Sequence, residues 1–196
     1  MATRWLLLGT LALCVLSVGC FSAGTMVGRG EMIGATAQLN DSRAAASSDQ
    51  RQLAIATAQL NDQRSMMDEY EVKQIEVTFH RALATKSVDL MMSIFADGAV
   101  MTTPSGVEYV GTAAIRVFFA TQSAAMQPQN HWAALVPAYK VTASITGNTG
   151  TLTFECHLVD IATNQIKLQH RIDMTVERSG TQWLVTTMKS TAIHLS

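Results

Sequence analysis

Histidine is the side chain in this sequence best suited to move a proton near neutral pH, and one histidine is singled out by its position. Residues 166–177 alternate between apolar and polar side chains, which is typical of a strand with one buried face. His170 is the one polar member of the apolar set, so its imidazole is expected to face inward. Burial lowers the pKa of an imidazole, and a neutral histidine can act as a general base. The alternative interpretation is a core histidine that is hydrogen-bonded to a neighbouring strand.

Two further side chains are candidate partners of His170 in acid–base chemistry. His131 and Tyr139 share one phase of a predicted strand over residues 131–145, although Pro137 interrupts the count. If that phase faces inward, an imidazole and a phenol join His170 at one site. An ordinary half-buried strand position explains each of the two equally well.

The other histidines and cysteines give weaker signals. His80 lies beside the centre of the apolar stripe of its predicted helix and is expected on a solvated flank. His157 is expected on the outer face of its strand, and the adjacent Cys156 is expected on the inner face. Cys156 is interpreted as a small buried apolar side chain. No spacing typical of metal ligands is present, so we expect neither a metal nor another cofactor.

The elements that must position these residues fall into a helical half and a β half. Helices are expected to begin near Asp68, which has capping-box spacing to Glu71, and near Ser87 and Gly111. A short strand between the second and third helices ends at Pro104. After residue 128 the apolar period changes to two, in segments 131–145, 151–161, 166–177 and 182–193. Helices followed by a strand meander predict an α+β domain with an antiparallel sheet.

The order and spacing of several short segments point to a known family. These are Ile94-Phe95-Ala96-Asp97-Gly98-Ala99-Val100, then Pro104, Gly106, Gly111 and Phe118-Phe119, and finally Ser179-Gly180-Thr181-Gln182-Trp183-Leu184-Val185. Over about residues 70–194 the chain resembles the SnoaL-like branch of the nuclear-transport-factor-2-like (NTF2-like) superfamily. The resemblance implies a cone-shaped, curved antiparallel sheet wrapped around N-terminal helices, a pocket at its open end, and a homodimer through the outer sheet face.

The same resemblance argues against two known activities of the superfamily. Ketosteroid isomerases use an aspartate base with a tyrosine and a protonated aspartic acid. Those positions correspond here to Thr103, Phe79 and Ile172, and none of these side chains ionises near neutral pH. The tyrosine–aspartate pair of scytalone dehydratases falls on residues 83–84, which are leucine and alanine. We therefore expect Phe79, Thr103, Ile172 and Met174 to line a ligand pocket.

Residues 1–23 resemble an export signal. Arg4 precedes an apolar run, and Ser17-Val18-Gly19-Cys20 resembles the lipobox of bacterial lipoproteins, with Ser17 where leucine is usual. The resemblance implies acylation of Cys20. A plain cleaved signal and an uncleaved anchor stay open, since the uncharged stretch 5–28 is long enough to cross a bilayer. Each interpretation places the domain outside the cytoplasm, in the cell envelope or on the extracellular face.

Residues 24–66 differ in composition from the predicted domain, residues 67–196. Ala35–Asp41 recurs identically as Ala56–Asp62, at an offset of 21 positions, which is a multiple of seven. The segment is therefore either a helical stalk that pairs with a partner or a mostly disordered spacer.

The bulk composition limits the function. A net charge of −1 with 15% charged residues gives no basic surface for nucleic acid. The sequence favours an exported, membrane-tethered domain that binds a small apolar ligand or a partner, and a cofactor-free lyase, isomerase or cyclase is the alternative. The outer sheet face around Glu155, His157, Arg171 and Asp173 is the expected partner surface. Whether the protein is an enzyme does not follow from the sequence.

Overall fold

The computed structural model describes residues 29–193, so the predicted leader with Cys20 lies outside the described residues. The chain divides into two units, 1–53 and 54–196, and the sheet belongs entirely to the second. None of the helices in the described part is long and apolar enough to cross a membrane.

A long helix, α1 (Arg29–Thr85), precedes the sheet and its short helices. The short helices are α2 (Val88–Met92), α3 (Thr112–Val117), the π-helical turn η1 (Phe118–Gln122) and the 3-10 turn η2 (Ala124–Met126). The strands are β1 (Phe95–Thr102), β2 (Glu108–Val110), β3 (Trp132–Ala134), β4 (Tyr139–Thr146), β5 (Thr149–Asp160), β6 (Gln165–Ser179) and β7 (Gln182–Ala192).

Helix α1 includes most of the predicted linker as well as the predicted first helix of the domain. Both copies of the repeat are helical, so a disordered spacer is the wrong interpretation of the described linker residues. Asp68 does not begin a helix either, because the Ala- and Gln-rich segment before it continues the helix without a break. Asp68 instead pairs with Arg178 of β6, and Glu71 lies 3.6 Å from the same guanidinium. Residues 37–67 are exposed and Asp68 is the first buried residue of α1 after them.

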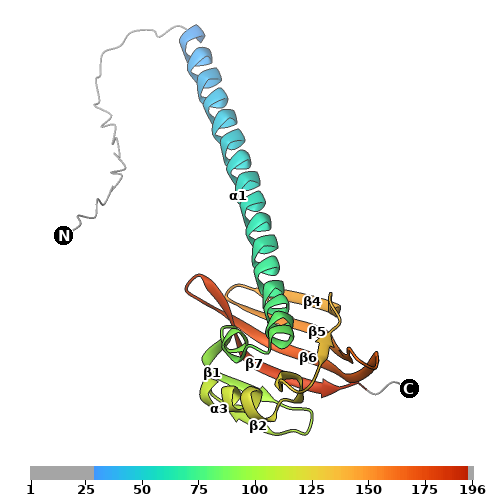
Figure 1. The fold of residues 1–196 in the computed structure, drawn as a ribbon. Helices are drawn as coiled ribbons and strands as arrows, with labels where there is room; N and C mark the ends of the chain where they lie inside the picture. Colours follow the sequence, from blue (N-terminus) through green and yellow to red (C-terminus); the bar gives the residue numbers. More distant parts are fainter. Residues whose placement is uncertain (1–28, 194–196) are drawn as a thin grey trace, which may run out of the picture. The chain divides into compact units, whose positions relative to one another are not determined.

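The strands form one curved, open sheet in the order β2–β1–β7–β6–β5–β3, with β4 also paired to β5 (Figure 1). Every pair is antiparallel except β1 with β7, which run parallel. The expected α+β class is confirmed, and the sheet is mixed because the strand from the helical half lies beside the last strand of the meander. The expected strand 131–145 is two strands, β3 and β4, which pair with different stretches of β5.

Two expected helix starts are confirmed. The Ser87 hydroxyl accepts a hydrogen bond from the Leu90 N–H at 3.2 Å and caps α2. Gly111, with φ of 83°, directly precedes α3, and this backbone conformation favours glycine. Strand β2 was not expected from the sequence, because its three residues are too short for a period of two to show.

The core lies between the last turns of α1 and the concave face of the sheet. Val72, Ile75, Phe79 and Leu83 repeat at helical spacing and are each at most 5% exposed. The Phe79 ring meets Phe154 of β5 edge to face, with centroids 5.5 Å apart. The apolar face of the sheet and the apolar face of the helix therefore cover each other, except where a cavity remains between them.

Candidate functional site

A cavity of about 150 Å³ lies at one end of the core. The last turns of α1, the end of β1, the turns η1 and η2, and the concave face of β5, β6 and β7 surround it. Its lining is mainly apolar and includes Phe79, Leu83, Met101, Phe118, Phe119, Leu158, Leu168, Ile172 and Met188. The principal polar or reactive groups on its wall are Thr103, Gln122, Ser123, Cys156, His170 and Ser190.

Three of the four expected pocket residues line this cavity. They are Phe79, Thr103 and Ile172, the positions that correspond to the isomerase residues. The Thr103 hydroxyl is already used by its own turn, since it lies 3.0 Å from the Ser105 hydroxyl and 3.2 Å from the Val107 carbonyl. The fourth, Met174, is 3% exposed but is not among the lining residues. An aspartate–tyrosine mechanism therefore finds none of its ionisable groups at the corresponding positions of this wall.

His170 lies where the alternation places it, on the cavity wall. Its Nδ1 shares a 3.0 Å hydrogen bond with the Ser190 hydroxyl of the neighbouring strand β7. Burial lowers the pKa of His170, so its imidazole is neutral at pH 7. A neutral imidazole can donate to or accept from a bound molecule, and it is the one titratable base on this wall.

The two proposed partners of His170 lie elsewhere. His131 is exposed, precedes β3 and is not part of the cavity lining. Tyr139 is also outside the lining and is 48% exposed. The pairing of β4 with β5 shifts between Tyr139 and Thr142, and Lys140 has a φ of 52°, so Tyr139 is turned to the outer face. The structure therefore does not bring these three residues together.

Sequence reasoning missed a buried ion pair on α1. His80 was expected on a solvated flank and is only 2% exposed, because Phe154 of β5 covers that side of the helix, with its ring centroid 5.4 Å from the imidazole. The His80 Nδ1 lies 2.6 Å from the carboxylate of Glu76, one turn earlier. This i,i+4 spacing of glutamate and histidine was the available signal in the sequence.

The second nitrogen of His80, Nε2, is buried and has no hydrogen-bond partner among the described residues. Burial lowers the pKa of His80, but the interactions with Cys156 and Glu76 together raise it by more than burial lowers it. The pKa therefore rises from 6.5 to about 10. At neutral pH His80 is therefore an imidazolium that faces the carboxylate of Glu76. Among the described residues, no cluster of three or more histidine, cysteine or acidic side chains is placed to hold a metal ion.

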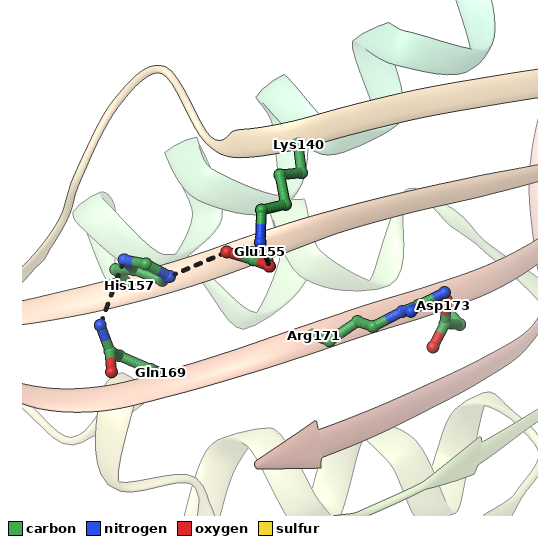
Figure 2. A network of polar contacts seen from close by, with 6 residues as sticks. All are labelled: Lys140, Glu155, His157, Gln169, Arg171 and Asp173. Carbon is green, nitrogen blue, oxygen red and sulfur yellow. Dashed lines mark hydrogen bonds and ion pairs between the residues drawn. The ribbon is translucent and has the colours of Figure 1, made fainter. Parts of the chain in front are cut away.

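The outer face of β4, β5 and β6 has a separate polar network (Figure 2). Lys140 Nζ lies 2.7 Å from Glu155, and His157 lies 3.5 Å from the other oxygen of that carboxylate. The hydrogen bond from Lys140 is the main reason that the pKa of Glu155 falls below its usual value. The neighbouring strand adds Arg171 and Asp173, which are 3.0 Å apart. The outward position of His157 is confirmed, and the use of this face by a partner or a second copy stays a prediction.

Comparisons with known proteins identify the fold. No protein-family model matches the chain, and no curated protein matches it. Among solved structures, an NTF2-like protein with a cystatin-like fold from Novosphingobium aromaticivorans has a TM-score of 0.61 at 11% identity, over 70% of this chain and 90% of that one. An NTF2-like protein of unknown function from Pseudomonas putida has a TM-score of 0.59 at 15% identity, over 67% and 90% of the two chains.

A third similar structure has a named activity. It is a candidate dehydratase of the NTF2-like family from Streptomyces avermitilis, with a TM-score of 0.55 at 13% identity, over 66% of this chain and 98% of that one. Identities this low relate the folds and not the activities. The chain therefore contains a domain with the NTF2-like, cystatin-like α+β fold.

Proposed function

We propose that this protein is exported, tethered to a membrane through Cys20, and binds a small, mainly apolar molecule that has one polar group. The observation that supports this most is the apolar cavity of about 150 Å³ with the His170–Ser190 pair on its wall. The wall places this pair and a few other polar groups within a mainly apolar surface, which is the usual composition of a small-molecule site.

The cavity volume limits the size of the ligand. An enclosed apolar cavity of about 150 Å³ in another protein takes up a single benzene molecule. A ligand of about one ring, or a short branched chain of similar size, therefore fits. The polar group of the ligand is expected to form a hydrogen bond with His170. A neutral imidazole can accept a hydrogen bond from a hydroxyl group or donate one to a carbonyl oxygen.

Phenol is expected to bind the full chain more tightly than benzene does. One additional hydrogen bond to His170 contributes about 0.5–1.5 kcal/mol, which corresponds to roughly a two- to twelvefold difference in Kd. Replacing His170 with phenylalanine should remove that difference while leaving benzene binding in place. Isothermal titration calorimetry with both ligands measures the difference in Kd. The matched control is His157→Phe on the outer face of β5, which should keep that difference. Equal affinities of the wild type for the two ligands would contradict the role of His170.

The tether is expected to be a lipid on Cys20. Cells that express the full chain with labelled palmitate should incorporate label into the protein, and Cys20→Ser should abolish the label and release the protein from the membrane fraction. Cys14→Ser is the matched control, because Cys14 lies in the same apolar run but not at the lipobox position. Label that persists in Cys20→Ser would rule out this site.

Acid–base catalysis without a cofactor is the second candidate function. Its supporting observation is the position of His170 on the cavity wall together with its lowered pKa. Under this alternative, His170→Phe removes turnover of a substrate, whereas a binding protein has no turnover to lose.

A further inference from the structure

The hydrogen bond between Ser190 and His170 determines which polar group the imidazole presents to the cavity. The two residues lie on neighbouring strands, β7 and β6, and both line the cavity. Ser190 is 7% exposed, and its hydroxyl lies 3.0 Å from Nδ1 of His170. A neutral imidazole carries its one N–H proton on either nitrogen, so this bond has two possible directions. The direction decides whether a ligand meets a donor or an acceptor at Nε2.

The surroundings of Ser190 favour a bond in which the hydroxyl is the donor. In the described part of the chain, Nδ1 of His170 is the one hydrogen-bond partner of this hydroxyl. If Nδ1 carried the proton, the buried O–H group would have no acceptor. Leaving a buried donor unsatisfied corresponds to roughly a five- to 150-fold preference for the other direction, in which the O–H donates to Nδ1. The proton of the imidazole is then on Nε2, because the bond made by one ring nitrogen sets the state of the other.

The Nε2–H group of His170 is available to a bound molecule. Among the described residues that line the cavity, none has an acidic side chain that would accept this proton or favour the charged ring. Burial lowers the pKa of His170, so the ring is neutral near pH 7 and carries a single N–H. Nε2 has no hydrogen-bond partner in the described chain, but it does not belong to the buried nitrogens that are closed off without a partner. Water or a ligand in the cavity therefore reaches it.

A second side chain of the cavity wall also offers a donor. Gln122 of η1 lines the cavity, and its Oε1 accepts a 2.5 Å hydrogen bond from the Tyr109 hydroxyl of β2. The acceptor of the amide is therefore occupied, and its NH₂ group, which only donates, is left. The Thr103 hydroxyl is engaged within its own turn, and the Ser123 hydroxyl can either donate or accept. The wall thus has an excess of donors.

We propose that the cavity selects small uncharged molecules whose polar group is a hydrogen-bond acceptor, a carbonyl above all, and that Ser190 sets this preference as a positioning residue acting through His170. The inference rests on the proposed function, because the ligand must first enter the cavity. A carbonyl oxygen complements Nε2–H. A ligand that only donates places its own N–H or O–H against Nε2–H and leaves both donors unsatisfied. Phenol stays a suitable ligand, because its oxygen can also accept.

The first measurement is the tautomer of His170 in the full chain without ligand. Long-range ¹H–¹⁵N NMR at about pH 7.5, above the usual pKa of an imidazole, distinguishes a ring nitrogen that carries a proton from one that does not, and His170→Phe identifies the signals. We expect the proton on Nε2 in the wild type and in Ser190→Thr, which keeps the hydroxyl, and a lower Nε2–H fraction in Ser190→Ala. The matched control is Thr191→Ala, which removes a hydroxyl from the adjacent, exposed position of β7 and should leave the tautomer unchanged. A proton on Nδ1 in the wild type, or an unchanged tautomer in Ser190→Ala, would overturn the role of Ser190.

The second measurement compares three rings of similar size: cyclopentanone, which only accepts, pyrrole, which donates through its N–H, and cyclopentane, which does neither. The methyl signals of Met101 and Met188 report entry into the cavity and give each Kd, since both residues line it. We expect cyclopentanone to bind more tightly than pyrrole, with a ratio of Kd values that falls about tenfold in His170→Phe and by a smaller factor in Ser190→Ala.

The outcomes separate this inference from the proposed function. Binding of the rings with the same ratio in the wild type and His170→Phe would overturn the selectivity for acceptors and leave ligand binding intact. Absence of methyl shifts with all three rings would overturn both. If a variant of His170 or Ser190 unfolds, the tautomer and the order of the two affinities in the wild type still decide between these outcomes.

Discussion

Glu76→Gln is expected to lower the free energy of unfolding by about 3 kcal/mol at pH 6.5. The substitution keeps the shape of the side chain but removes the charge that faces the buried imidazolium of His80, 2.6 Å away. Removing one partner of a buried ion pair typically costs about 3–5 kcal/mol, because the other charge is left without compensation. The lower end applies here, since His80 can release its proton. Urea unfolding followed by circular dichroism measures the change.

Helix α1 offers a matched control for this prediction. Glu69 and Lys73 form an ion pair with the same i,i+4 spacing and the same 2.6 Å separation, but their side chains are 47% and 41% exposed. An exposed pair of this kind contributes at most about 0.5 kcal/mol, so Glu69→Gln should be nearly neutral. Equal effects of the two substitutions would show that Glu76 and His80 do not form a buried charged pair.

The same pair should make stability depend on pH in a defined direction. The pKa of His80 rises from 6.5 to about 10 on folding, so the folded state binds the proton more tightly. The stabilisation is fully present below pH 6.5 and is lost as the pH rises through about 10. The difference between the wild type and Glu76→Gln should shrink over that interval. The titratable groups that face His80 are Glu76 on α1 and Cys156 on β5.

Phe154→Ala is expected to lower the free energy of unfolding by about 3–5 kcal/mol, which is typical of an aromatic ring removed from a closed core. Phe154 is fully buried on β5 and contacts the rings of Phe79 and His80, with centroids 5.5 and 5.4 Å away. Its loss leaves a cavity on the helix side of the sheet, which adds to the cost of the lost apolar contacts.

The control for Phe154 is an aromatic residue on the opposite face of the same sheet. Tyr139 stacks on His157, with centroids 4.7 Å apart, but is 48% exposed. Tyr139→Ala should cost less than about 1 kcal/mol, because half of its surface already meets water. A loss of less than 1 kcal/mol for Phe154→Ala, again from urea unfolding, would contradict its position in the core.

Strand periodicity determined much of what could be predicted. The inward positions of His170 and Ile172 follow from a clean alternation, and β6 has no bulge between them. Tyr139 was misplaced because the count crossed a shift in strand pairing at Lys140, where the backbone has a positive φ. A register shift depends on how two strands pair, and one strand's sequence does not reveal it.

Helix periodicity predicted which residues of α1 face the core, but not how far the buried face extends around the helix. The apolar stripe of α1 was predicted correctly, but the width of its buried face was not, since that depends on how far β5 covers the flank of the helix. His80 was therefore expected on a solvated flank. Its contact with Phe154 joins residues far apart in the sequence, and only the folded chain brings them together.

The central claim is that the cavity takes up a small apolar molecule. The most direct test is a titration of the full chain, with its methionine methyl groups labelled with ¹³C, against phenol by NMR. We predict saturable shifts of the Met101 and Met188 signals, since both line the cavity, and no shifts of the exposed Met66 and Met67 of α1. Unchanged Met101 and Met188 signals at millimolar phenol, or shifts of equal size at all four residues, would contradict binding in the cavity.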